Sequence, residues 1–427
     1  MKTWRIHLAG FGTVGAGLWH HLESHVDLIS RRTESRFEIT KIACRDPHKA
    51  TSRGAPADRI TTDLLSLATD PGAEILVELI GGIEPAYSLI KTALLNGKHV
   101  VTANKALLAA HGEELLTLAA KQQRHLLFEA SVAGAVPIIK AIRESLAANK
   151  ILSIHGIING TCNYILTQMT EKNLDYATAL AEAKQLGYAE ADESLDVDGH
   201  DTAHKAIILA ALAYGTWADE EKICVEGIRN INRLDLDFAA RLGYSLKLLA
   251  IIQSTDEKEI DLRVHPTLLP QSHVLASVKD VFNAIAVRGD ALGEALFYGR
   301  GAGALPTTSA VAADLIEIAR NPTPTPTSYK PSHAKLKPIS EVISRYYLRL
   351  NVIDRPGVLA QISSILARHQ IGISSVIQPK GHEGDWVPLI LMVHDAQEAA
   401  FQNARQEIET LPIVAPPAIV IRVEDFE

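Results

Sequence analysis

The sequence predicts an α/β fold with an N-terminal Rossmann-type doubly wound sheet, a middle α+β domain and a C-terminal ferredoxin-like domain. Two observations predict the first part: a strand, a glycine turn and a helix open the chain, and strands then alternate with helices. A third observation predicts the last part, because residues 341–427 follow the order βαββαβ.

The composition excludes several classes of protein. With 427 residues, 47% of them hydrophobic, the chain is long enough for two or three ordinary globular domains. A net charge of −8 and the lack of a basic block give no reason to expect nucleic acid or anionic lipid. No apolar run reaches the ~18 residues of a membrane span, no signal-peptide pattern is present, and the three cysteines form no CxxC pair. We expect a cytoplasmic protein without nucleic-acid or membrane partners.

The N-terminal turn has the pattern of a dinucleotide-binding site. A strand at Trp4–Ala9 leads into Gly10, Gly12 and Gly15 of GFGTVG, and a helix follows. In this context the first glycine makes the turn, the second lets the backbone approach a pyrophosphate, and the third lets helix and strand pack closely. A plain tight turn is the alternative.

The end of the second strand indicates which nicotinamide cofactor is bound. The strand at 37–44 ends in Arg45 and Asp46. The basic residues that follow are His48, Lys49 and Arg53. An acid here favours NAD, whereas basic residues favour the 2′-phosphate of NADP. Because the basic residues outnumber the acid, we expect NADP(H) to be preferred, with NAD(H) possible.

The remaining strands of this sheet place further polar residues at its carboxyl edge. Strands at 74–80 and 99–103 alternate with helices near 87–95 and 113–123. Ligands of such sheets lie beyond the carboxyl ends of the strands. The residues expected to face the nicotinamide are Gly81, Gly82, Thr102, Asn104 and Lys105. Lys105 is a candidate for chemistry, and the alternative is an ordinary surface lysine before a helix.

A polar turn of small residues follows the expected strand at 126–130. The turn contains Glu129, Ser131, Val132, Gly134 and Val136, and Pro137 starts a helix after it. A carboxylate beside exposed backbone carbonyls can hold a hard monovalent cation. A plain helix cap is the stronger interpretation on the residues alone.

Cys162 is a candidate nucleophile in the next turn. The strand at 151–158 leads into the polar cluster Asn159–Asn163, and a helix is expected from about Tyr164. Phosphorylating aldehyde dehydrogenases use such a cysteine to form a thioester. No histidine lies near Cys162 in the sequence, so a small buried thiol is the preferred interpretation.

The stretch from Ala183 to Ala206 concentrates negative charge before an apolar helix. Its six carboxylates are Glu190, Asp192, Glu193, Asp196, Asp198 and Asp201. Asp201 or Thr202 is a natural cap, which would place Lys205 in the first turn, facing the same way as Asp201. An ammonium held among carboxylates, with its pKa lowered by burial and by a helix N-terminus, can lend a proton to a carbonyl.

This stretch has other interpretations. A solvated acidic loop with one salt bridge stays open. A calcium loop fits residues 194–199 but fails at the twelfth position, where Lys205 stands instead of glutamate. His200 and His204 have the spacing of a metal pair, with Asp196 nearby. Because no HExxH motif accompanies them, we expect surface or capping histidines.

The second half of the chain contains a further strand-rich region and a linker. Strands are expected at 274–278, 281–289 and 295–299. A glycine-rich loop from Gly299 to Pro306 then precedes a helix at 309–320 and could close over a cofactor. Residues 321–338 are rich in proline and threonine, which is typical of a linker.

The chain resembles the homoserine dehydrogenases along nearly its whole length. The resemblance includes the acidic stretch, and its other motifs are GFGTVG at Gly10, VTANKALLA around Lys105, FEASVAGAVPII around Glu129, NGTCNYIL at Asn159 and YGRGAGALPTTSAV at Gly303. The C-terminal part, with DRPGVLA at its first turn, resembles an ACT domain, a module that binds amino acids.

The resemblance implies a reaction and roles for the charged residues. The enzyme would interconvert L-aspartate 4-semialdehyde and L-homoserine with NAD(P)H, in the biosynthesis of threonine, methionine and isoleucine. Lys205 would donate the proton to the aldehyde oxygen, and Lys105 would lie beside nicotinamide and substrate. Glu190 and Asp201 would hold the substrate, with Asp196 in support. A positioned lysine suits this chemistry because hydride transfer leaves an alkoxide-like oxygen.

The resemblance also implies the residues that bind cofactor and cation. The expected cofactor contacts are Gly10, Phe11, Gly12, Thr13, Val14, Gly15, Arg45, Gly81, Thr102, Lys105, Gly187 and Gly303. The positions that match the family's sodium site are Glu129, Val132, Gly134 and Val136, three of them through backbone carbonyls. This match favours a monovalent cation site over a plain helix cap at the Glu129 turn. Glu193 stands where the family usually has a proline, which leaves the conformation of that loop open.

The expected domains follow from these assignments. They are a dinucleotide-binding domain at 1–133, a catalytic and dimerisation domain at 134–305, a helix at 306–320 that packs back on the first domain, a linker at 321–340 and the ACT domain at 341–427. We expect feedback control with threonine as effector, in a homodimer or homotetramer. A passive dimerisation domain is the alternative for the ACT module. For the whole chain, the alternatives are an aldehyde dehydrogenase acting through Cys162 and a non-catalytic amino-acid sensor.

Overall fold

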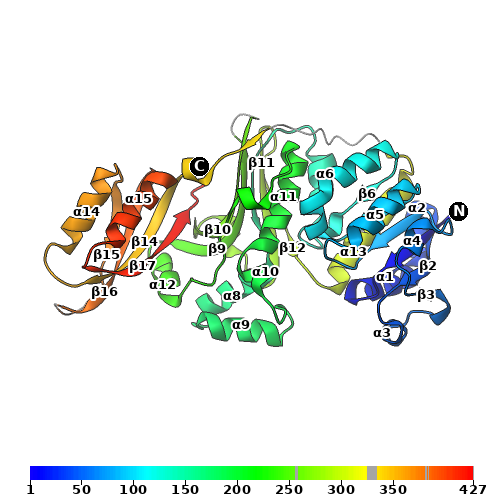
Figure 1. Ribbon diagram of the computed structural model, residues 1–427, viewed down its shortest axis with the longest axis horizontal. Helices are drawn as coiled ribbons and strands as arrows, with labels where there is room; N and C mark the ends of the chain where they lie inside the picture. Colours follow the sequence, from blue (N-terminus) through cyan, green and yellow to red (C-terminus); the bar gives the residue numbers. More distant parts are fainter. Residues whose placement is uncertain (255–257, 325–333, 380–381, 383, 427) are drawn as a thin grey trace. The chain divides into compact units, whose positions relative to one another are not determined.

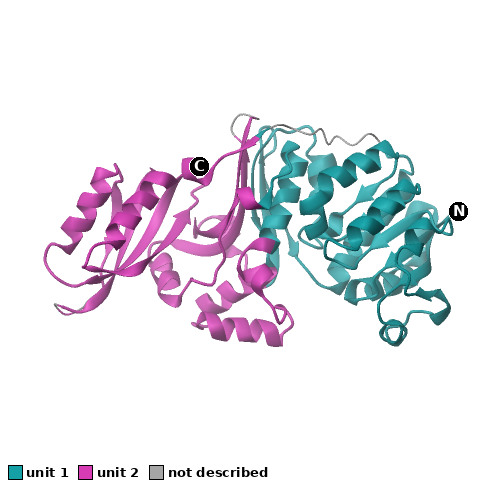
Figure 2. Cartoon of the chain, viewed as in Figure 1, with its two compact units in different colours: residues 1–159, 201–220, 281–334 teal, residues 160–200, 221–280, 335–427 magenta. Residues whose placement is uncertain are grey.

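The computed structural model describes residues 1–254, 258–324, 334–379, 382 and 384–426, which form two compact units (Figure 2). Unit 1 comprises residues 1–159, 201–220 and 281–334, and unit 2 comprises residues 160–200, 221–280 and 335–427. The chain therefore passes between the units several times. Part of the expected linker, residues 325–333, lies outside the described residues.

Unit 1 contains a six-stranded parallel sheet in the order β3-β2-β1-β4-β5-β6 (Figure 1). Its strands are β1 (Lys2–Ala9), β2 (Ser35–Ala43), β3 (Ile60–Thr61), β4 (Ile75–Glu78), β5 (His99–Thr102) and β6 (Leu126–Leu127). This order is that of the dinucleotide-binding doubly wound fold, so the predicted Rossmann-type sheet is confirmed. β6 is shorter than predicted because Glu129–Ser131 turn into a 3-10 helix.

Helices cover this sheet. They are α1 (Thr13–Ser24), α2 (Val26–Thr33), α3 (Pro47–Ser52), α4 (Ser66–Thr69), α5 (Ala86–Leu95), α6 (Lys105–Lys121) and α13 (Ala304–Arg320). α6 begins well before the predicted helix near 113–123, because the Asn104 side chain caps it by accepting from the Leu107 N–H. α13 likewise begins before the expected residue 309, so the glycine-rich loop ahead of it is short.

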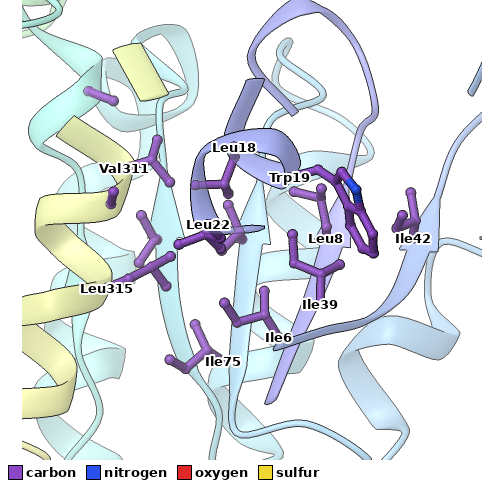
Figure 3. Close-up of a cluster of buried hydrophobic side chains, with 14 of the residues drawn as sticks. Ile6, Leu8, Leu18, Trp19, Leu22, Ile39, Ile42, Ile75, Val311 and Leu315 are labelled. Carbon is purple, nitrogen blue, oxygen red and sulfur yellow. The ribbon is translucent and has the colours of Figure 1, made fainter. Parts of the chain in front are cut away.

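The core of this sheet is formed by β1, α1 and α13. Figure 3 shows Leu18 and Leu22 of α1 beside Val311 and Leu315 of α13, with Ile6 of β1 below them. All of these side chains are buried. A parallel sheet with helices on its faces needs apolar residues on both sides of each strand, which the sequence of β1 supplies.

Unit 1 also contains an antiparallel group of strands. It is formed by β7 (Ile151–Ile157), β11 (Phe282–Gly289) and β12 (Gly293–Arg300), with β11 paired to both neighbours. The helical elements of this part are α7 (Ile138–Lys140), a π-helical segment at Ala141–Ser145 and α11 (His200–Tyr214). The strand predicted at 274–278 is wrong, since Val274–Ser277 form a 3-10 helix, capped by the His273 side chain.

Unit 2 is built around strands in the order β9-β10-β17-β14-β16-β15. These are β9 (Tyr244–Ser254), β10 (Glu259–Pro270), β14 (Ile343–Ile353), β15 (Ile373–Ile377), β16 (Trp386–Gln397) and β17 (Val414–Val423), and short strands β8 (Cys224–Val225) and β13 (Lys335–Leu336) pair with β10. Its helices are α8 (Gly160–Glu171), α9 (Tyr176–Gln185), α10 (Ser194–Val197), α12 (Arg233–Arg241), α14 (Val358–Arg368) and α15 (Glu398–Glu409).

The C-terminal part of unit 2 has the predicted βαββαβ order, from β14 to β17, which confirms the ferredoxin-like fold. Its sheet packs on α14 and α15 through a buried cluster that includes Ile362, Leu391 and Phe401. β17 also pairs with β10 at Thr267 and Leu268, so this module continues the sheet of the preceding region.

Within the described residues, we find no helix long and apolar enough to cross a membrane.

Candidate active site

The glycine turn between β1 and α1 requires glycine at two of its three positions. Gly10 has a φ of +98°, and a Cβ there would lie 2.7 Å from the Leu79 carbonyl oxygen. A Cβ on Gly15 would lie 2.2 Å from the Gly10 carbonyl oxygen, so close packing of α1 on the turn demands glycine. Around Gly12, at the N-terminus of α1, a Cβ would meet open space, which leaves room for a ligand to approach the backbone.

A cavity of about 660 Å³ opens beside this turn. Gly10, Phe11 and Gly12 line one side of it, and Gly81 and Gly82 line another. Its volume is within the range of small-molecule and cofactor sites. The predicted contacts Thr13 and Val14 lie just beyond the lining, in the first turn of α1, and Gly15 is buried under that turn.

Basic residues dominate the rim of this cavity at the end of β2. Arg45, Lys49 and Arg53 line it together with Asp46. The Asp46 carboxylate already accepts a hydrogen bond from the Lys49 backbone N–H, 3.0 Å away, and thereby caps α3. The acid is therefore engaged as a helix cap, while the exposed Arg45 lines the cavity.

The loop after β4 is held by a buried carboxylate. Glu78 Oε1 accepts from the backbone N–H groups of Ile80 and Gly81, at 2.8 and 3.1 Å. Its Oε2 accepts from the Thr102 hydroxyl at 2.5 Å. Thr102 is fully buried and does not line the cavity. Its hydroxyl helps to fix the loop that carries Gly81, and its expected place beside the nicotinamide stays a prediction.

Asn104 connects the cavity with the first lysine. Its side-chain N–H donates to the Gly82 carbonyl, 2.6 Å away, and its side-chain oxygen accepts from the Leu107 N–H. Lys105 follows as the first residue of α6. Lys105 therefore begins a helix at the edge of the sheet where Gly82 lines the cofactor cavity, which is the position expected of a residue near the reacting end of a nicotinamide.

A buried carboxylate joins the two candidate lysines. Asp201 Oδ1 lies 2.9 Å from Lys105 Nζ, and its Oδ2 lies 2.7 Å from Lys205 Nζ. The predicted proximity of Asp201 and Lys205 on one helix face is confirmed. The predicted position in the helix is corrected, because α11 begins at His200 and Lys205 falls in its second turn.

Two further groups, which the sequence did not predict, orient this cluster. Asn159 Nδ2 donates to Asp201 Oδ2 at 2.8 Å, and Lys205 Nζ donates to the Ile158 carbonyl at 2.7 Å. Both groups follow directly after β7. The end of that strand therefore fixes the ammonium and the carboxylate in one geometry.

The charges in this cluster are mutually stabilised. Burial raises the pKa of the Asp201 carboxyl, but the charges of Lys205 and Lys105 and their hydrogen bonds outweigh burial and leave that pKa below its usual value. The side chains of Asp201 and Lys205 are 5% and 11% exposed, whereas that of Lys105 is 35% exposed. The lowered pKa keeps Asp201 ionised near neutral pH, and this one carboxylate holds both amines.

The other acids of the 183–206 stretch have different partners. Glu193 pairs with Lys184 at 2.6 Å and with Arg229 at 3.1 Å, and Arg229 also binds Asp198. The hydrogen bond from Lys184 is the largest cause that lowers the pKa of Glu193 to about 2. In place of the usual proline, Glu193 therefore ties its loop to a helix and to a distant arginine. The expectation of a lysine surrounded by the loop's carboxylates needs correction.

Three predicted site residues lie in unit 2. Gly187, with a φ of +74°, and Glu190 are exposed in the segment after α9. Asp196 lies in α10 and is half-buried, and its backbone carbonyl accepts from the Cys162 thiol at 3.2 Å. In unit 1, Gly303 has a φ of +123° and occupies the N-cap position of α13, where an L side chain would be strained.

The Glu129 turn has the features of a helix cap. The Glu129 carboxylate accepts from the backbone N–H groups of Ile139 and Lys140, at 3.0 and 2.8 Å. Burial raises the pKa of this carboxyl, whereas the two N–H groups lower it. Val132 and Val136 are buried, and a Cβ on Gly134 would lie 2.5 Å from the Gly301 carbonyl oxygen.

Cys162 and the histidine pair do not form the sites that were weighed for them. Cys162 is fully buried in the first turn of α8, which begins at Gly160 rather than at Tyr164, and its thiol donates to a backbone carbonyl. His204 hydrogen-bonds the Glu220 carboxylate at 3.0 Å. No group of three or more histidine, cysteine or acidic side chains that could hold a metal occurs among the described residues.

Comparison with known protein families gives matches along most of the chain. The family described as "Homoserine dehydrogenase, NAD binding domain" matches residues 10–129, and "Homoserine dehydrogenase" matches residues 137–316. The ACT domain family matches residues 346–412. A homoserine dehydrogenase of Pseudomonas aeruginosa is 44% identical over 100% of both chains, and one of Synechocystis sp. is 41% identical over 99% of both.

Solved structures of homoserine dehydrogenases are also similar to this chain. The crystal structure of a homoserine dehydrogenase from Thiobacillus denitrificans has a TM-score of 0.94 and 42% identity, and the match covers 100% of this chain and 99% of that one. A hyperthermophilic archaeal homoserine dehydrogenase in complex with NADPH has a TM-score of 0.65 and 29% identity. That match covers 76% of this chain and 99% of the archaeal chain.

Proposed function

This chain belongs to the homoserine dehydrogenase family and is an oxidoreductase that acts on the CH–OH group of homoserine with a nicotinamide cofactor, and from that premise we propose how its residues carry out the reaction. The observation that carries the proposal is the buried Asp201 carboxylate, which holds the amines of Lys105 and Lys205 at 2.9 and 2.7 Å. Asn104 links this cluster to the cofactor cavity.

Lys205 is the group that we propose for proton transfer. The cofactor supplies or accepts the hydride at the substrate carbon. In the reductive direction, negative charge develops on the aldehyde oxygen, and an ammonium within hydrogen-bond distance can protonate it. Lys205 Nζ has three donors, of which two are used by Asp201 and the Ile158 carbonyl, so one is available for a substrate oxygen.

Asp201 and Lys105 complete the proposed catalytic group. Because Asp201 stays ionised, it orients the Lys205 side chain, and it can accept a hydrogen bond from the substrate's ammonium group. Lys105 lies at the carboxyl edge of β5 and places a second positive charge beside the nicotinamide. We assign Lys205 and Lys105 to catalysis and Asp201 to substrate binding.

NADP(H) is the cofactor that we propose to be preferred, with NAD(H) also accepted. The support is local: Arg45, Lys49 and Arg53 line the cavity, while Asp46 is engaged as a helix cap. The archaeal relative was solved with NADPH, which agrees with this assignment. Arg45 would bind the 2′-phosphate.

Other residues keep roles that rest on the family resemblance. Glu190 and Asp196 are proposed to contribute to substrate binding, and Gly187 and Gly303 to cofactor binding. Gly303 is supported by its position at the N-terminus of α13, where backbone N–H groups favour an anion.

A monovalent cation, expected to be Na+, is proposed at the Glu129 turn. The donor set fits a hard cation, because it would consist of one buried carboxylate and backbone carbonyls of Val132, Gly134 and Val136. The Val136 carbonyl also accepts from the Ile138 N–H at 2.8 Å, which leaves it one further lone pair. The cation would offset the cost of burying Glu129.

The ACT module indicates regulation by an amino acid, and we propose threonine as the effector. We further propose a cytoplasmic homodimer or homotetramer that serves threonine, methionine and isoleucine biosynthesis. The test of the whole proposal is a set of initial rates with L-homoserine and each nicotinamide cofactor, with and without threonine. Turnover with NADP+ that threonine inhibits is expected. Binding of cofactor and amino acid without turnover would favour the sensor alternative.

A further inference from the structure

Unit 2 contains a cavity of its own, with a volume of about 210 Å³. It lies among α8, α12, β9 and the 3-10 helix at Val274–Ser277, which pack on one another. Figure 1 labels α8, α12 and β9 in this region. None of the residues assigned above to substrate, cofactor or cation lines it.

The walls of this cavity are amphipathic. Leu166, Leu236 and Leu246 supply apolar surface from three different elements, and Ala276 supplies more from the 3-10 helix. Lys247 of β9 also lines the cavity, although its side chain is almost completely buried. A ligand that fits these walls needs an apolar body and a polar group that an ammonium can bind.

The Lys247 ammonium is incompletely satisfied by the protein. The residue is only 5% exposed, and its Nζ donates to Asn163 Oδ1 at 3.1 Å and to the Val278 carbonyl. An ammonium has three N–H donors. Among the residues that the structure describes, the Lys247 ammonium has no third acceptor and no carboxylate in ion-pair distance. A buried charge in this situation is costly unless another group pairs with it.

The charged groups that face Lys247 come from the neighbouring segments. Burial is the largest cause that lowers the pKa of Lys247 to about 8, and the charge of Lys279 lowers it further, whereas Glu171 and Asp280 raise it. Lys279 and Glu171 pair with each other at 2.5 Å and are both about half exposed. Their charges largely cancel, and Asp280 does not line the cavity, so Lys247 supplies the net positive charge of the cavity lining.

We propose that this cavity is a binding site for a small aliphatic carboxylate, whose anionic group accepts the third N–H of Lys247 while its chain contacts the leucine walls. The volume sets the size, since an apolar cavity of about 150 Å³ admits benzene. A cavity of about 210 Å³ therefore suits an acid of roughly four or five carbons. The site does not depend on the dehydrogenase assignment.

The pH dependence of binding follows from the same geometry. A bound carboxylate favours the charged form of Lys247, so binding raises the pKa of this amine and takes up a proton when the pH is near or above 8. Above that pH the amine of the free protein is increasingly neutral. Affinity should then fall by about tenfold for each further pH unit.

The test is calorimetric titration of the full chain with butanoate and, separately, with the uncharged butanamide, at pH 7 and pH 9. We expect saturable binding of butanoate that weakens about tenfold at pH 9, and no binding of butanamide. Lys247→Met should abolish the binding. Lys279→Met is the matched control, because Lys279 is already paired at the rim, and it should retain binding within about threefold.

If Lys247→Met does not fold, a second variant tests the same site. Ala276→Phe fills the cavity from its half-buried rim and leaves Lys247 in place, so it too should abolish butanoate binding. Binding that survives both substitutions would place butanoate elsewhere, for example in the homoserine site, and would overturn the proposal. Equal affinities for butanoate and butanamide, or no butanoate binding in the unsubstituted protein, would also overturn it.

Discussion

Two charged clusters that are neighbours in the sequence differ in their burial. Asp201 joins Lys105 and Lys205, and the Asp201 side chain is 5% exposed. Glu193 and Asp198 join Lys184 and Arg229, whose side chains range from 15% exposed at Glu193 to 39% at Arg229. Ionic interactions are strengthened where water is excluded and weakened where it is present. Charge density alone therefore does not identify the catalytic group, whereas burial around a fixed pair of amines does.

The largest contrast is expected when an acid of each cluster is neutralised. Asp201→Asn leaves two amines without their anion, so kcat/KM for homoserine should fall by about 10³-fold. Glu193→Gln, in the exposed cluster, should change kcat/KM by less than about threefold. Steady-state rates of homoserine oxidation measure both. Similar losses in the two variants would show that burial does not separate the clusters.

The lysines should show the same contrast with a smaller effect. Lys105→Met removes a positive charge beside the nicotinamide and should lower kcat by about 10²-fold. Lys184→Met is its counterpart in the second cluster, with a similarly exposed side chain (37% against 35% for Lys105), and should leave kcat within about twofold of the original. If the two variants behave alike, Lys105 is an ordinary surface lysine before a helix and has no catalytic role.

A third test asks whether Arg45, at the basic rim of the cofactor cavity, makes the protein prefer NADPH over NADH. Arg45→Ala should weaken NADPH binding by about tenfold and NADH binding by much less, because only NADPH carries the 2′-phosphate. Fluorescence titration with each cofactor measures both affinities. Arg36→Ala is a matched control, since Arg36 is exposed on β2, the strand that precedes Arg45, but does not line the cavity. Equal losses for both cofactors would show that Arg45 does not bind the 2′-phosphate.

The smallest effect is expected at Cys162. Because its thiol is buried and donates to the Asp196 carbonyl, Cys162→Ser should keep kcat within about twofold of the original. Rate measurements at saturating homoserine suffice. Loss of activity in a folded Cys162→Ser variant would revive a thioester mechanism.

Acid stability offers a comparison within the buried cluster. The pKa of Asp201 is lowered in the folded protein, so its contribution to stability is present above the unfolded pKa of about 3.9 and is lost as the pH falls through the folded value. The free energy of unfolding should therefore change little through Asp201 between pH 5 and pH 8. Denaturant titrations of the original chain and of Asp201→Asn should differ by a constant amount across that range.

The fold could be predicted where the pattern is local. The glycine turn, the strands of the parallel sheet and the βαββαβ module follow from the periodicity of hydrophobic residues and from glycine and proline residues that mark turns. Both signals lie within short stretches of sequence. Helix starts were less accurate, because α6, α8 and α13 all begin earlier than predicted. Gly160 in the first turn of α8 and Pro306 in that of α13 resemble a loop. β9 was not predicted, since its continuous apolar run resembles a buried helix.

The site could be predicted only in part, for a related reason. The pairing of Asp201 with Lys205 depends on helical spacing, which the sequence contains. The links from Lys105 and Asn159 to Asp201 join residues far apart in the chain, and so does the link from Arg229 to Glu193. No local signal marks these partners. The positions of Lys105, Asn159 and Asp201 follow from the sheet order and from how α11 is placed in unit 1, whereas Arg229 and Glu193 both lie in unit 2.

The central claim is that the amine of Lys205 handles the proton while the hydride moves. Its most direct test is the rate of homoserine oxidation by Lys205→Ala at saturating NADP+, with and without added ethylamine. We predict a fall in kcat of about 10³-fold, with unchanged cofactor affinity and partial recovery when the external amine is supplied. A Lys205→Ala enzyme that retains more than about a tenth of the original kcat would contradict the claim.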